Sequence, residues 1–186
     1  PLLDRIISAF QSAFVPGGYI HDNILLTHEI MHKFKNLKTK TTCIAIKLDM
    51  EKAYDRIKWD FILKCLQELG FHHTWNSWIK QCISSVMYLI IINDEPNSLF
   101  IPTRGIRQGD PLSPYLFILC MEALNHMHLK EANSPKSRVG VKIYLTSVKI
   151  PCLIFADNYL LFCKTNSWSY SKLKASFTSF VQIQVS

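Results

Sequence analysis

The chain has 186 residues, a formal net charge of +7 and a pI near 9.1, with 48% hydrophobic and 19% charged residues. This balance excludes an intrinsically disordered chain. No apolar run approaches the ~18 residues of a membrane-spanning helix, so we expect no membrane partner. The length suits one domain or two small, intimately packed ones. The basic charge permits a nucleic-acid partner but does not require one.

The six cysteines lie in apolar runs, and no two of them form a C-x-x-C pair. We therefore expect reduced core residues of an intracellular protein, nuclear or cytoplasmic, rather than zinc ligands or disulfides. The chain begins without a methionine and stops abruptly after Gln184-Val185-Ser186, so we expect a piece of a longer protein. The cysteines are Cys43, Cys65, Cys82, Cys120, Cys152 and Cys163.

The first 42 residues combine a loop, a helix and a basic segment. Pro16-Gly17-Gly18 marks the loop, and Asp22 or Asn23 can cap the helix that follows. Basic residues then crowd into one short span, which is either a solvated surface or a surface that contacts phosphates. The basic residues of this span are Lys33, Lys35, Lys38, Lys40, Lys47, Lys52, Arg56 and Lys58.

Residues 43–48 alternate in the manner of a half-buried strand. The alternation predicts that Ile44, Ile46 and Leu48 share one face. Asp49 then lies at the carboxyl end of the strand, on the more polar face. An acidic residue there adds nothing to a core. Taken alone, Asp49 is best explained as a turn residue or a cap of the following helix.

Two helices and a pair of strands are expected in the middle of the chain. Apolar stripes predict a helix that ends near Leu69, with Gly70 as its C′ residue, and a second helix that carries residues 75–83. Residues 87–93 and 99–102 are expected to form strands joined by a turn.

Residues 104–114 hold two glycines, two arginines and two prolines. Ser113 can cap the helix that follows, with Pro114 at its first position. A loop of this composition, opening a helix, can present backbone N–H groups and cations to a phosphate or a nucleic-acid strand. An ordinary connecting loop is the alternative, and the loop alone does not decide between them.

Two apolar strands are expected on either side of Asp157-Asn158, because both residues favour the positive φ angles of a type I′ hairpin turn. Residues 139–150 contain one or two short strands. Beyond residue 164 the pattern is weaker, with Leu173, Phe177 and Phe180 spaced as a helical stripe.

These features together supply an aspartate at a strand end, an aspartate at a hairpin tip and a basic glycine-containing loop. Two carboxylates from separate strand ends can hold Mg²⁺ ions against substrate phosphates, as two-metal displacement at phosphorus requires. A basic surface beside them suits a template and a primer.

The sequence resembles the reverse transcriptase domain of non-LTR (LINE-type) retrotransposons, especially those of plants. Residues 49–55 (Asp-Met-Glu-Lys-Ala-Tyr-Asp) resemble motif A, and residues 104–114 resemble motif B. Phe155-Ala156-Asp157-Asn158 occupies the place of motif C, where the family has Phe/Tyr-Ala-Asp-Asp. Residues 11–17 resemble the fingers segment before motif A. The resemblance covers nearly the whole chain, in the family's order.

The resemblance implies an α+β fold: a right-hand polymerase fingers–palm fragment in which an antiparallel palm sheet packs on helices. It implies partial fingers over residues 1–42, a palm carrying motifs A, B and C over 43–166, and a degenerate C-terminal tail over 167–186. A thumb and an endonuclease are expected to be absent, so the resemblance indicates a truncated copy.

The implied reaction is RNA-directed DNA synthesis, in which a DNA primer 3′-OH attacks the α-phosphate of a dNTP on an RNA template with two Mg²⁺ ions, or Mn²⁺. Asp49 and Asp157 match the catalytic, metal-binding carboxylates, and Met50 adds a backbone carbonyl. Tyr54 matches the aromatic gate against ribonucleotides. The remaining expected contacts are Arg104, Arg107, Gln108 and Gly109 for substrate, and Lys47, Lys52 and Arg56 for nucleic acid.

The chain departs from the family at two positions. Asn158 replaces a second aspartate, which removes one negative charge from the metal position and predicts a weak or inactive polymerase. Gly18 stands where related sequences carry an arginine. Two alternatives therefore stay open: a non-catalytic nucleic-acid-binding remnant and an unselected pseudogene fragment. The sequence leaves the oligomeric state open.

Overall fold

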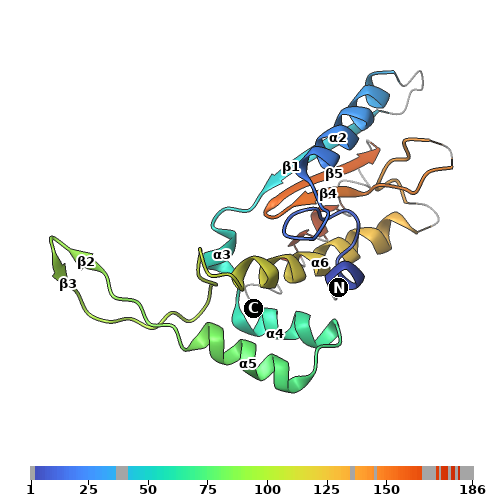
Figure 1. Ribbon diagram of the computed structural model, residues 1–186. Helices are drawn as coiled ribbons and strands as arrows, with labels where there is room; N and C mark the ends of the chain where they lie inside the picture. The colour runs from blue at the N-terminus through green and yellow to red at the C-terminus, as the bar shows by residue number, and fades with distance from the viewer. Residues whose placement is uncertain are drawn as a thin grey trace.

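The computed structural model consists of a small antiparallel sheet between helices, with a thin arm extending from one end (Figure 1). The structure describes residues 3–36, 42–134, 137–144, 146–164, 171, 173–175, 177, 178 and 180. The helices are α1 (Leu3–Ile6), α2 (Ile20–Lys35), α3 (Ala53–Arg56), α4 (Trp59–Glu68), α5 (His73–Ser84) and α6 (Ser113–Ala132). The strands are β1 (Cys43–Asp49), β2 (Ile91–Ile92), β3 (Glu95–Pro96), β4 (Cys152–Phe155) and β5 (Asn158–Lys164).

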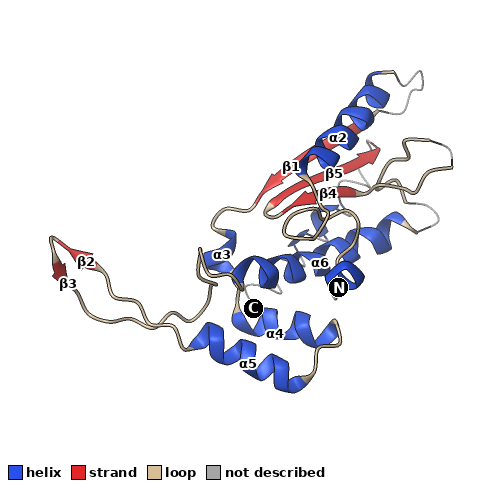
Figure 2. Cartoon of the chain, viewed as in Figure 1, coloured by secondary structure: helices blue, strands red, loops and turns tan. Residues whose placement is uncertain are grey.

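The main sheet has three antiparallel strands in the order β1-β5-β4. Helix α2 lies on one side of this sheet and α6 on the other, with α4 and α5 beyond α6 (Figure 2). The free edge of β4 is bonded to the segment before α2, since the Ile154 N–H donates to the Phe10 carbonyl at 2.8 Å. The expected α+β class, with an antiparallel sheet packed on helices, is confirmed.

The alternation predicted for residues 43–48 is confirmed. Ile44, Ile46 and Leu48 pack against the main hydrophobic core, whereas Ala45 packs against a second cluster on the other face. Strand β5 alternates in the same way, with Leu161 in the main core. Both faces of the sheet are therefore apolar over most of their length, and the strands are held from both sides.

Helix α6 is the central support of the sheet because it is apolar almost all round. Leu116, Phe117, Ile118 and Leu124 are among its fully buried residues. A helix with this pattern is stable only where neighbours cover it on every side. The sheet covers one side of α6, and α4 covers another.

Several predicted element ends are displaced. Helix α2 begins at Ile20 without a side-chain cap, so the predicted cap at Asp22 or Asn23 is wrong. The Asn23 amide instead donates to the Ile154 carbonyl at 3.0 Å, which attaches α2 to β4. Ser113 is the first residue of α6 rather than its cap, and the Asp110 carboxylate accepts the Leu112 N–H at 2.8 Å.

The two strands predicted for 87–93 and 99–102 are mostly wrong. Regular pairing is limited to β2 and β3, around a tight turn in which Asn93 and Asp94 both have positive φ. Below the turn, Tyr88 and Phe100 form an isolated bridge. Figure 1 shows that this arm projects away from the rest of the chain, so no core supports longer strands there. Residues 139–150 likewise form isolated bridges, one of them between Val141 and Ile150.

The described residues of the C-terminal segment contribute to the core. Leu173 and Phe180 are buried, and the Phe180 ring makes an edge contact with Phe61 at 5.5 Å between centroids. The helical stripe predicted there therefore has a packing role, and the degenerate tail over 167–186 stays a prediction. Among the described helices, none is long and apolar enough to cross a membrane.

A chain of buried polar groups connects α6 to the sheet. His128 Nδ1 lies 2.7 Å from the Tyr159 hydroxyl, and this hydroxyl donates to the Cys152 thiol at 3.3 Å. The thiol in turn donates to Asn125 Oδ1 at 3.2 Å. Burial lowers the pKa of His128 from 6.5 to about 4, so the folded protein requires a neutral imidazole.

Acid should destabilise the protein through His128. The unfolded chain binds a proton near pH 6.5 and the folded chain only near pH 4, so this contribution is complete above pH 6.5 and is lost as the pH falls. Lowering the pH to about 5 should cost roughly 2 kcal/mol of the free energy of unfolding. Denaturant unfolding at several pH values measures this cost.

The His128→Gln variant isolates the contribution of the imidazole. It should flatten the pH dependence of the free energy of unfolding between about pH 7 and 5. Glu122 titrates in the opposite direction, because burial raises its pKa and favours its protonated form in the folded state. Its contribution cancels when the two proteins are compared. An unchanged slope in His128→Gln would show that His128 does not carry the acid sensitivity.

Candidate active site

Asp49 and Asn158 are cross-strand partners at the end of the sheet. They form the last register pair between β1 and β5, so their side chains emerge on the same face, and both residues are exposed. Cα atoms of such partners lie about 4.5–5.5 Å apart. Asp157 precedes Asn158 in the turn from β4 and is half-buried. The fold thus brings the two predicted carboxylates to one end of the sheet.

The hairpin turn differs from the predicted type I′ turn at Asp157-Asn158. Phe155 pairs with Asn158, so the two turn residues are Ala156 and Asp157, and Asn158 is already the first residue of β5. Of these turn residues only Ala156 has a positive φ, at 54°. A positive φ confined to the first turn residue is the type II′ pattern. Because β5 begins at Asn158, this residue is the one that pairs with Asp49 of β1.

Gln11 is a site residue that the sequence did not single out. Its side chain is buried, and Oε1 accepts the Ala156 N–H at 3.3 Å and the Ala13 N–H at 2.9 Å. The turn that carries Asp157 is therefore held by the segment before α2. The available signal was the resemblance of residues 11–17 to the family's fingers segment, which contains this glutamine.

The donor atoms at this end of the sheet are of the type that Mg²⁺ binds, but one position is weakened. Asp49 and Asp157 offer carboxylate oxygens, and hard cations bind such oxygens. The Asn158 amide donates to Asp157 Oδ1 at 3.3 Å, so it occupies part of a carboxylate that a cation would use. Within the described residues, no three His, Cys, Asp or Glu side chains form a metal-binding group.

Tyr54 packs on α6 and is influenced by the charge of Asp157. Its ring stacks on Phe117, with 4.9 Å between centroids and 15° between planes. Partial burial raises the pKa of the Tyr54 hydroxyl, and the charge of Asp157 raises it further. The charge of Asp157 thus acts on the phenol, whose ring is fixed in place against Phe117.

The predicted substrate loop is attached by its backbone to the segment after β1. The Ile106 N–H donates to the Tyr54 carbonyl at 2.9 Å, and the Gly105 N–H donates to the Ile57 carbonyl at 2.8 Å. The Trp59 indole donates to the Gly105 carbonyl at 2.7 Å. A side chain at Gly105 would lie 3.0 Å from the Asp55 carbonyl, at a φ of +88°. Only glycine suits this contact.

Arg104, Arg107 and Gln108 line one hollow of about 560 Å³, together with Asp55. These three predicted substrate residues are exposed there. Gly109 follows them with a φ of +86° and with open space around its Cα. The loop therefore presents two guanidinium groups and an amide to a shared opening, a geometry suited to an anionic ligand.

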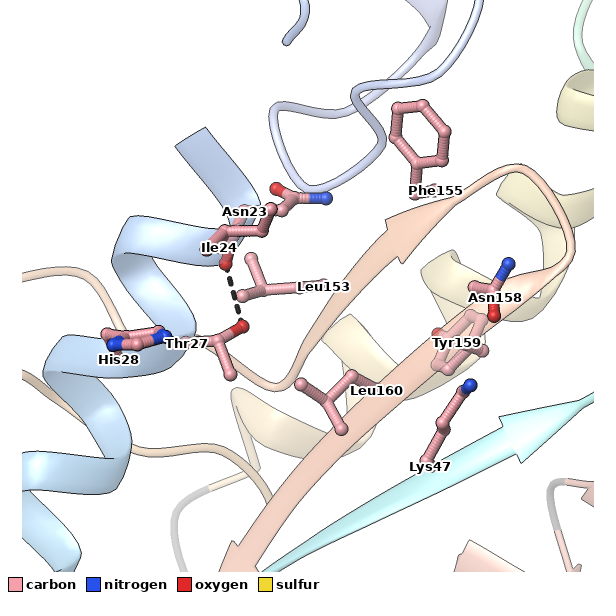
Figure 3. A pocket seen from close by; sticks show the side chains of 10 residues that line it. All are labelled: Asn23, Ile24, Thr27, His28, Lys47, Leu153, Phe155, Asn158, Tyr159 and Leu160. Carbon is pink, nitrogen blue, oxygen red and sulfur yellow. Dashed lines mark hydrogen bonds between the residues drawn. The ribbon is translucent and has the colours of Figure 1, made fainter. Parts of the chain in front are cut away.

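Lys47 and Asn158 line a different hollow, of about 320 Å³, between α2 and the sheet (Figure 3). Figure 3 shows them on the sheet side, with Asn23 and Thr27 on α2 across from them. Most other lining residues are apolar, among them Leu153. Because Asn158 lines it, this hollow lies next to the exposed pair of Asp49 and Asn158 at the end of β1.

The other predicted contacts are more scattered. Lys52 is exposed in a left-handed conformation before α3, and Arg56 forms an exposed ion pair with Glu51 at 3.9 Å. Met50 is half-buried against the main core. The described members of the basic span of residues 33–58 do not all face one hollow, since Lys33 and Lys47 line different ones. Two of its members, Lys38 and Lys40, lie outside the described residues.

The chain shares its fold with a part of known telomerase structures. It superposes on telomerase from Candida tropicalis, solved in complex with a fragment of telomeric RNA, with a TM-score of 0.65 and 13% identity over 94% of this chain and 28% of that one. Apo telomerase from the same species gives a TM-score of 0.61 and 15% identity over 91% of this chain and 32% of that one. At such identities the likeness concerns the fold alone.

The chain belongs to the reverse transcriptase (RNA-dependent DNA polymerase) family, whose model matches residues 2–183. It is 31% identical over 155 residues to the transposon TX1 uncharacterized 149 kDa protein of Xenopus laevis. It is 30% identical over 145 residues to the Pol polyprotein of a type-1 R2 retrotransposable element of Popillia japonica. These matches cover 79% and 77% of this chain but only 12% and 19% of the two relatives. The domain is thus related to non-LTR retrotransposon reverse transcriptases.

The close approach at Gly105 should be required for stability. Gly105→Ala and Gly109→Ala introduce the same methyl group at nearly the same positive φ, but only Gly105 faces the Asp55 backbone. We expect Gly105→Ala to lower the free energy of unfolding by about 1 kcal/mol or more beyond the effect of Gly109→Ala. Urea denaturation of both variants measures the difference. Equal losses would mean that backbone strain alone, and not the contact with Asp55, sets the requirement.

Proposed function

We propose that this domain catalyses RNA-directed DNA synthesis on an RNA template, in which a primer 3′-OH attacks the α-phosphate of a dNTP, the deoxynucleotidyl group joins the primer and pyrophosphate leaves. The observation that supports this most directly is the placement of Asp49 beside the Asp157-Asn158 turn, at the end of one sheet. The loop that carries Arg107 and Gln108 is attached to the Tyr54 segment beside the same site. A carboxylate pair next to an anion-binding loop is the arrangement that nucleotidyl transfer requires.

Asp49 and Asp157 would hold the Mg²⁺ ions, or Mn²⁺, with the Met50 carbonyl as a further ligand and Asn158 as a weakened position. When bound, the ions neutralise charge at the reacting phosphate. Asn158 supplies one neutral acceptor oxygen, and its amide engages Asp157. We therefore propose that cation binding is impaired in this chain.

The protein's own side chains position the substrates. Tyr54, held against Phe117, would exclude the 2′-OH of a ribonucleotide from the space beside Asp157. Arg104 and Arg107 would bind the triphosphate, with Gln108 and Gly109 beside the incoming nucleotide. Lys47 and Lys52 would contact the nucleic-acid backbone, and so would Arg56, after exchanging its exposed partner Glu51 for a phosphate. Positioning of this kind accounts for most of the protein's part in phosphoryl transfer.

We further propose that the domain comes from a plant lineage of these retrotransposons. It is supported by 47% identity over 70 residues to an uncharacterized mitochondrial protein of Arabidopsis thaliana, which covers 38% of this chain and 57% of that protein.

A second candidate function is nucleic-acid binding without chemistry. The observation that favours it is the amide at Asn158, which leaves two carboxylates where the family has three.

Asn158→Asp should increase primer extension. The exposed position tolerates the change, and the added carboxylate strengthens the cation site. We expect an increase of about tenfold or more in extension rate with Mg²⁺, which corresponds to roughly 1.4 kcal/mol of activation free energy. Gel-based extension of a DNA primer on an RNA template measures it. Asn158→Ala, which removes the amide without adding charge, is the matched control and should give no increase.

Two further outcomes decide between the candidate functions. Extension by the Asn158→Asp protein should disappear when Asp49→Asn is added, because the cation then loses a ligand. RNA binding without extension in every variant would reject the polymerase proposal in favour of the binding-only function.

Tyr54→Ala should reduce the preference for dNTPs over NTPs, since it opens the space beside Asp157. Tyr54→Phe keeps the ring on Phe117 and should keep the preference. The measurement is single-nucleotide incorporation in the Asn158→Asp protein. We expect at least about a tenfold loss of discrimination in Tyr54→Ala, or roughly 1.4 kcal/mol. If Tyr54→Phe loses as much as Tyr54→Ala, the hydroxyl rather than the bulk of the ring is responsible.

A further inference from the structure

A second basic hollow opens at the far end of the main sheet from Asp49. Its volume is about 570 Å³, and it lies between the end of α2, the loop after α6 and the last residue of β5. Figure 1 shows the end of β5 and the loop before β4 at the end of the sheet away from α3. The basic side chains that line it are Lys33, Arg138, Lys142, Lys149 and Lys164. Among the described residues, no carboxylate lines this hollow.

The positive charges of the hollow act on one another. The pKa of Lys149 is lowered by burial first and then by the charges of Lys164 and Lys142, while Glu131 opposes the shift. The charges of Lys164 and Lys33 also reach the Cys43 thiol, where they oppose the effect of burial on its pKa. The cations are thus close enough to repel each other, and a bound anion would relieve that repulsion.

Two of the lysines donate hydrogen bonds to backbone carbonyls, so their ammonium groups are held in fixed positions in the wall of the hollow. Lys149 Nζ donates to the Ala132 carbonyl at 2.9 Å and to the Ser137 carbonyl at 3.0 Å, which anchors the loop after α6 to the helix end. Lys33 Nζ donates to the Ile143 carbonyl at 2.8 Å and also to the Lys142 carbonyl. Both ammonium groups remain part of the positive wall.

Arg138 and Lys164 form the exposed side of the hollow. Their segments are bonded to each other, since the Lys164 N–H donates to the Arg138 carbonyl at 3.0 Å. Both side chains are exposed. A guanidinium and an ammonium group on adjacent segments can contact successive phosphates of one strand, whereas a single phosphate would need donors that converge on one point.

We propose that this hollow binds the phosphodiester backbone of a nucleic-acid strand at a distance from the reacting end. The proposal rests on the proposed function, in that the strand is the one that the domain copies or extends. Strand β1 runs from Cys43 to Asp49 between the two sites. Its six residue steps correspond to about 20 Å, or roughly six nucleotides of a strand.

Arg138→Gln combined with Lys164→Gln tests the proposal. We expect the dissociation constant for a single-stranded RNA of about 20 nucleotides to rise about tenfold, and the salt slope of log K to fall by about 1.4, for two lost phosphate contacts. Fluorescence anisotropy over a range of salt concentrations gives both values. The matched control is Lys64→Gln with Lys80→Gln, which removes the same charge from exposed positions on α4 and α5. Equal losses in the two variants would reject a defined site.

Further measurements distinguish binding of a nucleic-acid strand from binding of a free polyphosphate. They also keep the test of this proposal independent of the polymerase assay. If inorganic pyrophosphate binds with heat released in calorimetry, and the binding is lost in the Arg138 and Lys164 variant while RNA affinity is unchanged, the hollow takes a free anion and the proposal is overturned. Arg138→Gln alone should give half of the slope change. RNA affinity is measured without dNTP and needs no extension, so a failed polymerase assay does not decide whether this hollow binds RNA.

Discussion

The antiparallel pairing of β1 with β5 is the interaction on which the rest of the structure depends. Both strands bury residues on both faces, with Ile46 in contact with the main core and Phe162 within the second cluster. A slip of one residue would exchange the two faces of a strand and expose its apolar side chains. The core therefore fixes the register, and the register places Asn158 opposite Asp49. Apolar packing along the middle of the two strands therefore decides which residues meet in the candidate active site at their end.

A second constraint ties the loop before α6 to the segment after β1. The contact is made mainly by backbone groups, through Gly105 and the Tyr54 carbonyl, so it depends on close approach and not on particular side chains. Tyr54 takes part twice, since its ring also stacks on Phe117 of α6. The packing of α6 under the sheet and the attachment of the loop that carries Gly105 are consequently linked. A change that moves α6 would also move the aromatic ring beside Asp157.

The charges are arranged along the sheet in a manner that suits a polyanion. One hollow lies at the loop of Arg104 and Arg107, where Asp55 is the acidic neighbour, and another lies at the end of β5 around Lys164. The chain's net charge of +7 is thus concentrated partly in two places. In the interior, by contrast, the polar groups around His128 are neutral and bonded to one another, because charge there would have to be desolvated.

The sequence by itself determined the elements whose signals are local. These were the alternation of β1, the helices after Asp55, the hairpin near Asp157 and the family, whose motifs are short contiguous patterns. It could not determine the displaced turn, the support of that turn by Gln11, or the short β2–β3 pairing, since each depends on contacts between distant segments or on their absence. Lys33 and Lys47 belong to one basic span of the sequence but line different hollows in the folded chain. The hollow around Arg138 and Lys164 is the reverse, because only the folded chain brings the end of α2, the loop after α6 and the end of β5 together.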